Sequence, residues 1–172
     1  MGYKGTEEAL FAAATDKRTV HLATHGRIDP ERPDRSYLLL AGDEESDDAR
    51  LSYAEIPGLA PYLSECRLVV LSACESGLPV EAEGEGDEGE VIISINGLSA
   101  QFRRAGVETL VASMWEVDDA STRALMTTFY DRLGAGEDIA HALQASQQAL
   151  ITSEDWSHPW YWAPFVVMGD WR

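Results

Sequence analysis

Residues 67–77, RLVVLSACESG, constrain the fold of this chain more than any other stretch. They begin with branched apolar residues that do not alternate with polar ones, which is typical of a strand covered on both faces in a parallel sheet. The step Ser76-Gly77 would end this strand. Cys74 would then lie at the carboxyl edge of the sheet, where open α/β sheets form their binding crevices. Because cysteine is also a common packing residue, the strand alone leaves a structural role open.

A second strand that carries candidate functional residues is predicted at residues 18–26, RTVHLATHG. Its apolar residues alternate with His21 and His25, as expected of a strand, and Gly26 would end it and let its backbone N–H approach a ligand closely. His21 and His25 would share one face about 13 Å apart, which is too far for two ligands of one metal. We therefore expect no metal and no cofactor. His25 alone is compatible with a structural role as well.

The rest of the chain alternates between predicted helices and strands, which indicates an α/β domain with a mainly parallel sheet and helices on both faces. Residues 79–90 interleave carboxylates with glycines, so we expect an exposed loop, either an active-site lid or a passive insert. The expected helices are 6–14, 51–56, 92–105, 119–133 and 139–150, and the expected strands are 18–26, 36–42, 67–74 and 108–114, with an aromatic loop and a final strand within 158–170.

Composition excludes several classes of function. The formal net charge is −17, which argues against direct contact with nucleic acid or an anionic membrane, since phosphate binding needs clustered Lys and Arg. The sequence shows neither an export signal nor a membrane-spanning apolar stretch. The two cysteines, Cys66 and Cys74, are too few for a disulfide framework. We therefore expect a reducing, cytoplasmic setting, where a thiol can stay a nucleophile and Cys66 is a packed thiol.

The strand ends carry the residue types needed for acyl transfer. A thiolate at Cys74 can attack a carbonyl, and an imidazole at His25 can give a proton to the leaving amine. The backbone N–H groups of Gly26 and Cys74 are the natural donors to the developing oxyanion. A neighbouring pocket with an acidic floor would select a basic residue before the cut bond, and the nearest carboxylates in this layout belong to Asp118, Asp119, Glu116 and Glu75.

Four ordered motifs together resemble the CHAT domain over nearly all of the chain. They are HLATHG at 21–26, LSACESG at 71–77, VASMWEVDD at 111–119 and HPWYWAPF at 158–165. CHAT domains are caspase-like cysteine peptidases related to separase and are often fused to tetratricopeptide repeats in bacteria. The resemblance implies a caspase-like three-layer sandwich, a bacterial source, a repeat partner and a protein substrate.

The same resemblance implies roles for individual residues. His25 and Cys74 match the catalytic dyad of the family. Residues 115–119 are similar to the separase segment that supplies an acidic specificity residue, and Asp119 is the closest match. Together with the carboxylates named above, Trp115 and Ser113 complete the substrate-binding residues that we expect.

The chain departs from the family pattern in three ways. A full CHAT domain is usually longer on its amino side, so residues 1–172 are expected to be a single domain that lacks that part. The acidic loop is longer and more charged than the usual Gly-Glu-Gly stretch of the family. Ser72 stands where metacaspases have an acidic pocket residue, so the acid must come from another position.

Three functions are compatible with these residues. The leading hypothesis is a cysteine endopeptidase that acts on another protein, after a basic residue, under the control of a partner repeat domain. A second hypothesis is a binding or scaffold module that keeps the fold and uses the cleft without cutting. A third is a small-molecule acyl hydrolase that uses the same dyad.

Overall fold

The computed structural model describes residues 7–27, 29, 35–40, 49–74, 98 and 100–171. The acidic loop at 79–90, Glu75, Thr6 and the first turns of the helix expected at 92–105 lie outside the described residues, while residues 98 and 100–104 are helical. The helices are α1 (Glu7–Ala14), η3 (Ile56–Leu59), α3 (Asp119–Gly134), α4 (Ile139–Ile151) and α5 (Pro159–Trp162), and the strands are β1 (Thr19–Arg27), β2 (Tyr37–Leu39), β3 (Arg50–Ser52), β4 (Leu68–Cys74), β5 (Thr109–Ser113) and β6 (Phe165–Gly169).

The strands form one mixed sheet in the order β3-β2-β1-β4-β5-β6. The central strands β1, β4 and β5 run parallel to one another. On one side β2 pairs antiparallel with β1 and β3 pairs antiparallel with β2, and on the other side β6 pairs antiparallel with β5. The α/β fold class with a parallel central sheet is therefore confirmed. The parallel strands all present their carboxyl ends at the same edge, which is the edge where the sequence places the candidate dyad.

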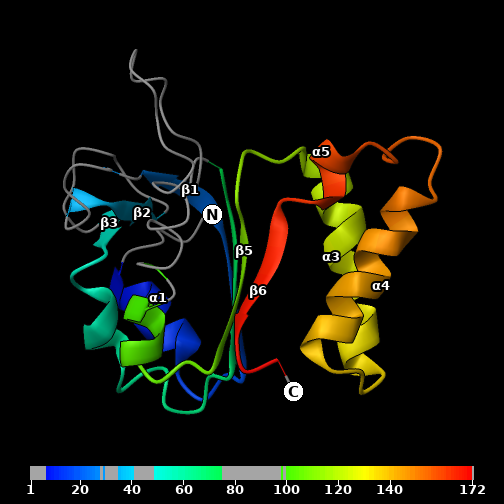
Figure 1. Ribbon diagram of the computed structural model, residues 1–172. Helices are drawn as coiled ribbons and strands as arrows, with labels where there is room; N and C mark the ends of the chain where they lie inside the picture. The colour runs from blue at the N-terminus through cyan, green and yellow to red at the C-terminus, as the bar shows by residue number, and fades with distance from the viewer. Residues whose placement is uncertain are drawn as a thin grey trace.

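Helices cover both faces of the sheet and make two separate apolar cores (Figure 1). In β4, Val69 and Leu71 pack into the core on the side of α1, whereas Leu68 and Val70 pack into the core under α3 and α4. All four side chains are buried. The prediction that residues 67–74 form a strand covered on both faces is thus confirmed, and β4 anchors the candidate site in the rigid centre of the fold.

The prediction of a helix at residues 51–56 is wrong. Arg50–Ser52 instead forms the edge strand β3, because it pairs antiparallel with β2, with Leu51 in register with Leu38. The short helix η3 begins only at Ile56, and Pro57 lies at its start rather than ending it. Proline is tolerated in a first helical turn because its missing N–H has no partner there.

Two strand boundaries also differ from the predicted ones. The strand expected at 36–42 is limited to Tyr37–Leu39, and residues 41–48 lie outside the described residues. Gly26 does not end β1, because His25 to Arg27 continue the strand by pairing antiparallel with β2. Residues 19–25 of β1 thus pair with β4, residues 25–27 pair with β2, and His25 pairs with both strands.

The part of the chain that follows β5 agrees with the prediction. Helices α3 and α4 lie within a few residues of the expected ranges, and the aromatic segment begins with α5 and leads into β6. None of the helices among the described residues has the length and apolar character needed to cross a bilayer.

Candidate functional site

The strand order brings three chemically important chain segments to one edge of the sheet. Because β1, β4 and β5 are neighbours, the edge carries His25, Cys74 and the segment 115–119 that follows β5. His25 and Cys74 are direct register partners in the parallel pair β1/β4. Neighbouring strands lie about 4.8 Å apart, so the backbones of the two expected dyad residues lie side by side.

A cleft of about 490 Å³ extends from this edge between β1 and α3. It exists because α3 and α4 pack on β4, β5 and β6, and no residue of β1 takes part in that core. The alternate residues of β1 from His21 to His25 therefore stay exposed and form one wall. The lining residues are His21, Ala23, Thr24, His25, Ser72, Val117, Asp119, Thr122, Arg123, Met126, Thr127 and Tyr130.

A chain of three hydrogen-bonded side chains crosses the cleft from the sheet to the helix. The Nε2 atom of His21 lies 3.0 Å from the Oγ of Ser72, and its Nδ1 atom lies 2.9 Å from the hydroxyl oxygen of Tyr130. Partial burial of the imidazole lowers the pKa of His21 below its usual 6.5. Burial also raises the pKa of Tyr130 to about 12. At neutral pH this hydrogen-bonded group of side chains therefore consists of an uncharged His21 imidazole between the protonated hydroxyl groups of Ser72 and Tyr130.

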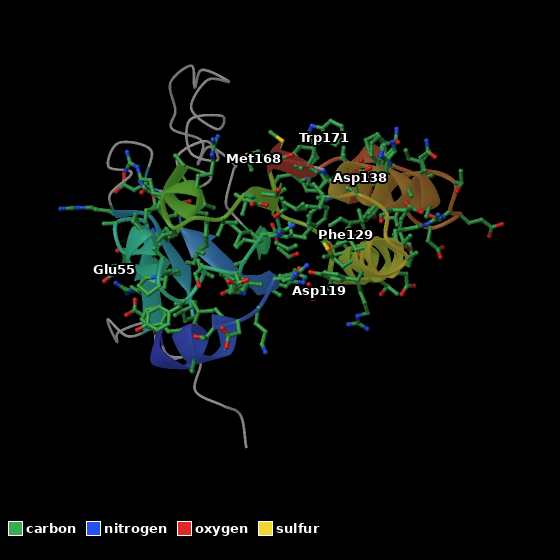
Figure 2. The ribbon with its side chains drawn as sticks, turned by 90° about the horizontal axis from the view of Figure 1, so that it is seen from below. Glu55, Asp119, Phe129, Asp138, Met168 and Trp171 are labelled. Carbon is green, nitrogen blue, oxygen red and sulfur yellow. The ribbon has the colours of Figure 1, made fainter. Side chains whose placement is uncertain are left out.

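The helix α3 supplies the charged residues of the cleft. Its start is fixed by Asp118, whose carboxylate accepts a hydrogen bond of 2.8 Å from the backbone N–H of Ser121. Asp119 is consequently the first helical residue, and Figure 2 shows it on the side of α3 that faces β1. Arg123 follows one turn later and lines the same cleft. Asp119 and Arg123 thus contribute a carboxylate and a guanidinium to the cleft from positions one helical turn apart, about 6 Å along the axis of α3.

The other residues predicted for substrate binding occupy different surroundings. Trp115 packs against Trp160, with ring centroids 5.9 Å apart, and its indole N–H donates to the Trp160 carbonyl oxygen. Ser113 is fully buried at the end of β5. Glu116 is exposed, and Asp118 acts as the helix cap described above.

The backbone of the predicted oxyanion site is partly defined. Gly26 is buried within β1, next to His25, and is in register with Leu38 of β2. Cys74 is the last residue of β4. Both expected N–H donors thus belong to neighbouring strands at the edge where the cleft opens.

Sequence reasoning identified His25 and Asp119 but missed His21, Ser72 and Tyr130 as a unit. The strand pattern places His21 on the same face as His25, and the family resemblance marks Ser72 as a position without the expected acid, but neither signal predicts their hydrogen bond. Tyr130 carries no local signal, because it is 109 residues from His21 in the chain. The contact depends on how α3 docks over the sheet.

The second cysteine, Cys66, is a packed thiol, as the sequence predicts. Cys66 is buried, its Sγ donates a hydrogen bond to the Leu68 carbonyl oxygen at 3.4 Å, and burial raises the pKa of its thiol. Within the described part of the chain, no three His, Cys, Asp or Glu residues gather where a metal ion could be held.

Comparison with known proteins gives a consistent assignment. The family profile of the CHAT domain matches residues 1–170. Tetratricopeptide repeat protein 28 from Homo sapiens is 27% identical over 191 residues, which cover 98% of this chain and 8% of that protein. The protein of the same name from Mus musculus is 25% identical with the same coverage.

The chain spans about 8% of the length of these curated relatives. Both relatives are mammalian, so they lend no support to the bacterial source that the sequence resemblance suggested. The match to the family profile covers nearly the whole chain and agrees with the α/β fold, the parallel centre of the sheet and the four sequence motifs. The chain belongs to the CHAT domain family.

Proposed function

We propose that this chain is a cysteine endopeptidase domain in which Cys74 and His25 form the catalytic dyad. The observation that carries the proposal is their register: the two residues are direct partners on neighbouring parallel strands, at the carboxyl edge of the sheet. His25 also lines a cleft of about 490 Å³, a volume in the usual range of ligand-binding sites. Membership of a family related to caspase-like peptidases supports the same chemistry.

The proposed mechanism proceeds through a thioester. The Cys74 thiolate attacks the scissile carbonyl carbon, and the carbonyl π electrons move to oxygen, where the N–H groups of Gly26 and Cys74 stabilise the oxyanion. Collapse of the tetrahedral intermediate breaks the C–N bond while the His25 imidazolium gives its proton to the leaving amine. Neutral His25 then takes a proton from water, which attacks the thioester and releases the acid and the thiolate.

The proposal includes a preference for a basic residue before the cut bond. Asp119 lines the cleft that opens beside the dyad positions, and its carboxylate would attract an ammonium or guanidinium group. Arg123 lines the same cleft and repels such a group. The selectivity is therefore set by the balance of two charges on one face of α3.

The proposal places the domain beside a regulatory repeat region and in a reducing compartment such as the cytoplasm. The two relatives are named as tetratricopeptide repeat proteins, and the matching region is about 8% of their length. Repeat arrays form extended concave surfaces, so such a region could present a protein substrate to the cleft or alter its loops. A thiol nucleophile needs a reducing setting to stay free.

The alternative function is a CHAT-fold scaffold that binds without cutting, and the relatives are named only for their tetratricopeptide repeats. Thiol alkylation separates the two functions. In the folded protein, Cys74 is expected to react rapidly with iodoacetamide at pH 7, and His25→Ala should slow this reaction about tenfold or more, because the imidazolium stabilises the thiolate.

Peptide mapping by mass spectrometry assigns the label to one of the two cysteines. Cys66 provides the internal control, since it is buried and the pKa of its thiol is raised. Equally slow labelling of Cys74 in the wild type and in His25→Ala would support the scaffold and contradict the peptidase.

A second prediction concerns the charges of α3. In a fluorogenic tetrapeptide screen, Asp119→Asn should reduce kcat/KM for peptides with Arg or Lys before the cut bond by about tenfold, relative to peptides with a neutral residue there. Arg123→Gln should change the ratio in the opposite direction, because it removes the competing positive charge. Asp131→Asn, an exposed position further along α3, is the matched control. Unchanged ratios in the first two variants would contradict the assigned pocket.

A further inference from the structure

Residues 158–165, HPWYWAPF, are the one motif of the four found in the sequence to which the proposed mechanism gives no role. They comprise α5, its flanking residues and the first residue of β6, and they lie beside the turn that connects β5 to α3 (Figure 1). This turn, residues 114–118, leads directly into Asp119 at the start of α3. We call residues 114–118 the recognition turn and residues 158–165 the aromatic segment.

Two hydrogen bonds connect the recognition turn to the aromatic segment. The backbone N–H of Met114 donates to the Pro164 carbonyl oxygen at 3.0 Å, which continues the antiparallel pairing of β5 with β6. The indole N–H of Trp115 donates to the Trp160 carbonyl oxygen at 3.2 Å, and the two indole rings pack against each other. The first two residues of the turn are therefore held in place by the aromatic segment.

The aromatic segment is in turn held by Gln147 of α4. The side-chain Nε2 of this residue donates hydrogen bonds to the carbonyl oxygens of Trp162 at 3.1 Å and Phe165 at 3.0 Å. A primary amide carries two N–H groups, so each of them has one acceptor. Because both partners are carbonyl oxygens, the nitrogen and not the oxygen of the amide must face them.

The positions of these two carbonyl groups explain why a side-chain donor is needed. Trp162 is the last residue of α5, and the carbonyl groups in the last turn of a helix have no partner within the helix. Phe165 begins the edge strand β6. Because the Pro164 carbonyl faces β5, the next carbonyl, that of Phe165, faces away from β5 and toward α4.

We propose that Gln147 is a positioning residue that fixes the recognition turn through the aromatic segment. Gln147 is not among the residues that line the cleft, so it acts through other groups. Its amide holds the segment at two points, and the carbonyl groups of Trp160 and Pro164 between α4 and the turn pass this constraint on. The inference rests on the proposed peptidase function, because that function gives the turn its part in substrate binding.

A different contact sets the geometry of the proposed dyad. His25 and Cys74 are register partners on β1 and β4, and neither strand takes part in the contacts of Gln147. Removal of the Gln147 amide should therefore weaken substrate binding and leave the thiol chemistry intact. A merely structural role would instead reduce the amount of folded enzyme, which lowers the apparent kcat and leaves KM unchanged.

The first test replaces Gln147 with methionine, which has a similar length but no N–H donor. For a fluorogenic tetrapeptide with Arg before the cut bond, KM should rise about fivefold while kcat stays within about twofold. The rate at which iodoacetamide alkylates Cys74 should not change. Gln148→Met, at the exposed neighbouring position of α4, is the matched control and should leave all three quantities unchanged.

A second variant tests the other end of the same connection. Trp115→Phe keeps an aromatic ring but removes the indole N–H that bonds the Trp160 carbonyl oxygen, so KM should rise as in Gln147→Met. Because both side chains act through one segment, the double variant should raise KM by less than the product of the two single effects. Independent, multiplicative effects would overturn the proposal. Thermal unfolding followed by circular dichroism shows that each variant is folded.

A spectroscopic measurement separates this proposal from the peptidase hypothesis. The protein is labelled with 5-fluorotryptophan, and the fluorine NMR signal of Trp115 is assigned by its absence in Trp115→Phe. Gln147→Met should shift or broaden this signal, whereas Gln148→Met should not. If no peptide is cleaved while the signal responds to Gln147→Met, the positioning role is supported and only the peptidase is refuted. An unchanged Trp115 signal, or an unchanged KM in an enzyme that cleaves, refutes the positioning role.

Discussion

Replacing Cys74 with alanine is expected to reduce peptide cleavage about a thousandfold or more, with little change in the free energy of unfolding. The large effect follows because no other group would form the thioester, and loss of the nucleophile removes the whole covalent route. A fluorogenic tetrapeptide library, varied at the residue before the cut bond, measures the rate. Thermal unfolding followed by circular dichroism shows whether the variant is folded.

Cys66→Ala is the matched control for that substitution. Cys66 is buried just before β4, at the opposite end of that strand from Cys74, and its Sγ donates a hydrogen bond to the Leu68 carbonyl oxygen at 3.4 Å. Cleavage should stay within about twofold of the wild type. Cleavage that persists in Cys74→Ala would remove Cys74 from the mechanism. Cleavage that disappears in Cys66→Ala while the protein stays folded would contradict the assignment of Cys66 as a packing residue.

The second large effect is expected for stability at Phe129. This side chain of α3 is fully buried in the core between the sheet and the helices α3 and α4, and it is labelled in Figure 2. Phe129→Ala should lower the free energy of unfolding by about 3–5 kcal/mol, because it removes apolar contacts and leaves a cavity. Urea denaturation followed by tryptophan fluorescence measures the change.

The exposed residue Asp131 on the same helix provides the comparison. Asp131→Ala should change the free energy of unfolding by no more than about 0.5 kcal/mol. A loss below about 1 kcal/mol in Phe129→Ala would mean that α3 does not depend on this core. Since α3 carries both Asp119 and Tyr130, its docking also holds one wall of the cleft in position.

Much of the fold could be predicted from local sequence. The apolar run before Cys74 predicted a strand covered on both faces, and β4 has its alternate residues in two different cores. The spacing of apolar residues after Asp118 predicted α3, and the carboxylate of Asp118 caps it. Such signals work because strand and helix periodicity are properties of consecutive residues.

Local sequence failed where pairing with a distant segment decided the structure. The sequence predicts that residues 51–52 start a helix, but they belong to β3 (Arg50–Ser52), because β2 offers an edge with which they can pair. β1 continues past Gly26 for the same reason. Short segments have weak intrinsic preferences, so tertiary contacts override them.

The sequence by itself determined that residues 19–25 and 68–74 are strands, with Cys74 ending the second, and it put Asp119 at the start of a helix. Only the tertiary structure decided that His25 and Cys74 are register partners, that α3 and α4 leave β1 uncovered, and that Tyr130 reaches His21. The physical reason is the distance along the chain over which the deciding interactions act. The periodicity of a buried strand and the cap of a helix depend on neighbouring residues, whereas a cleft and a hydrogen-bonded chain across it depend on how a helix docks on a sheet.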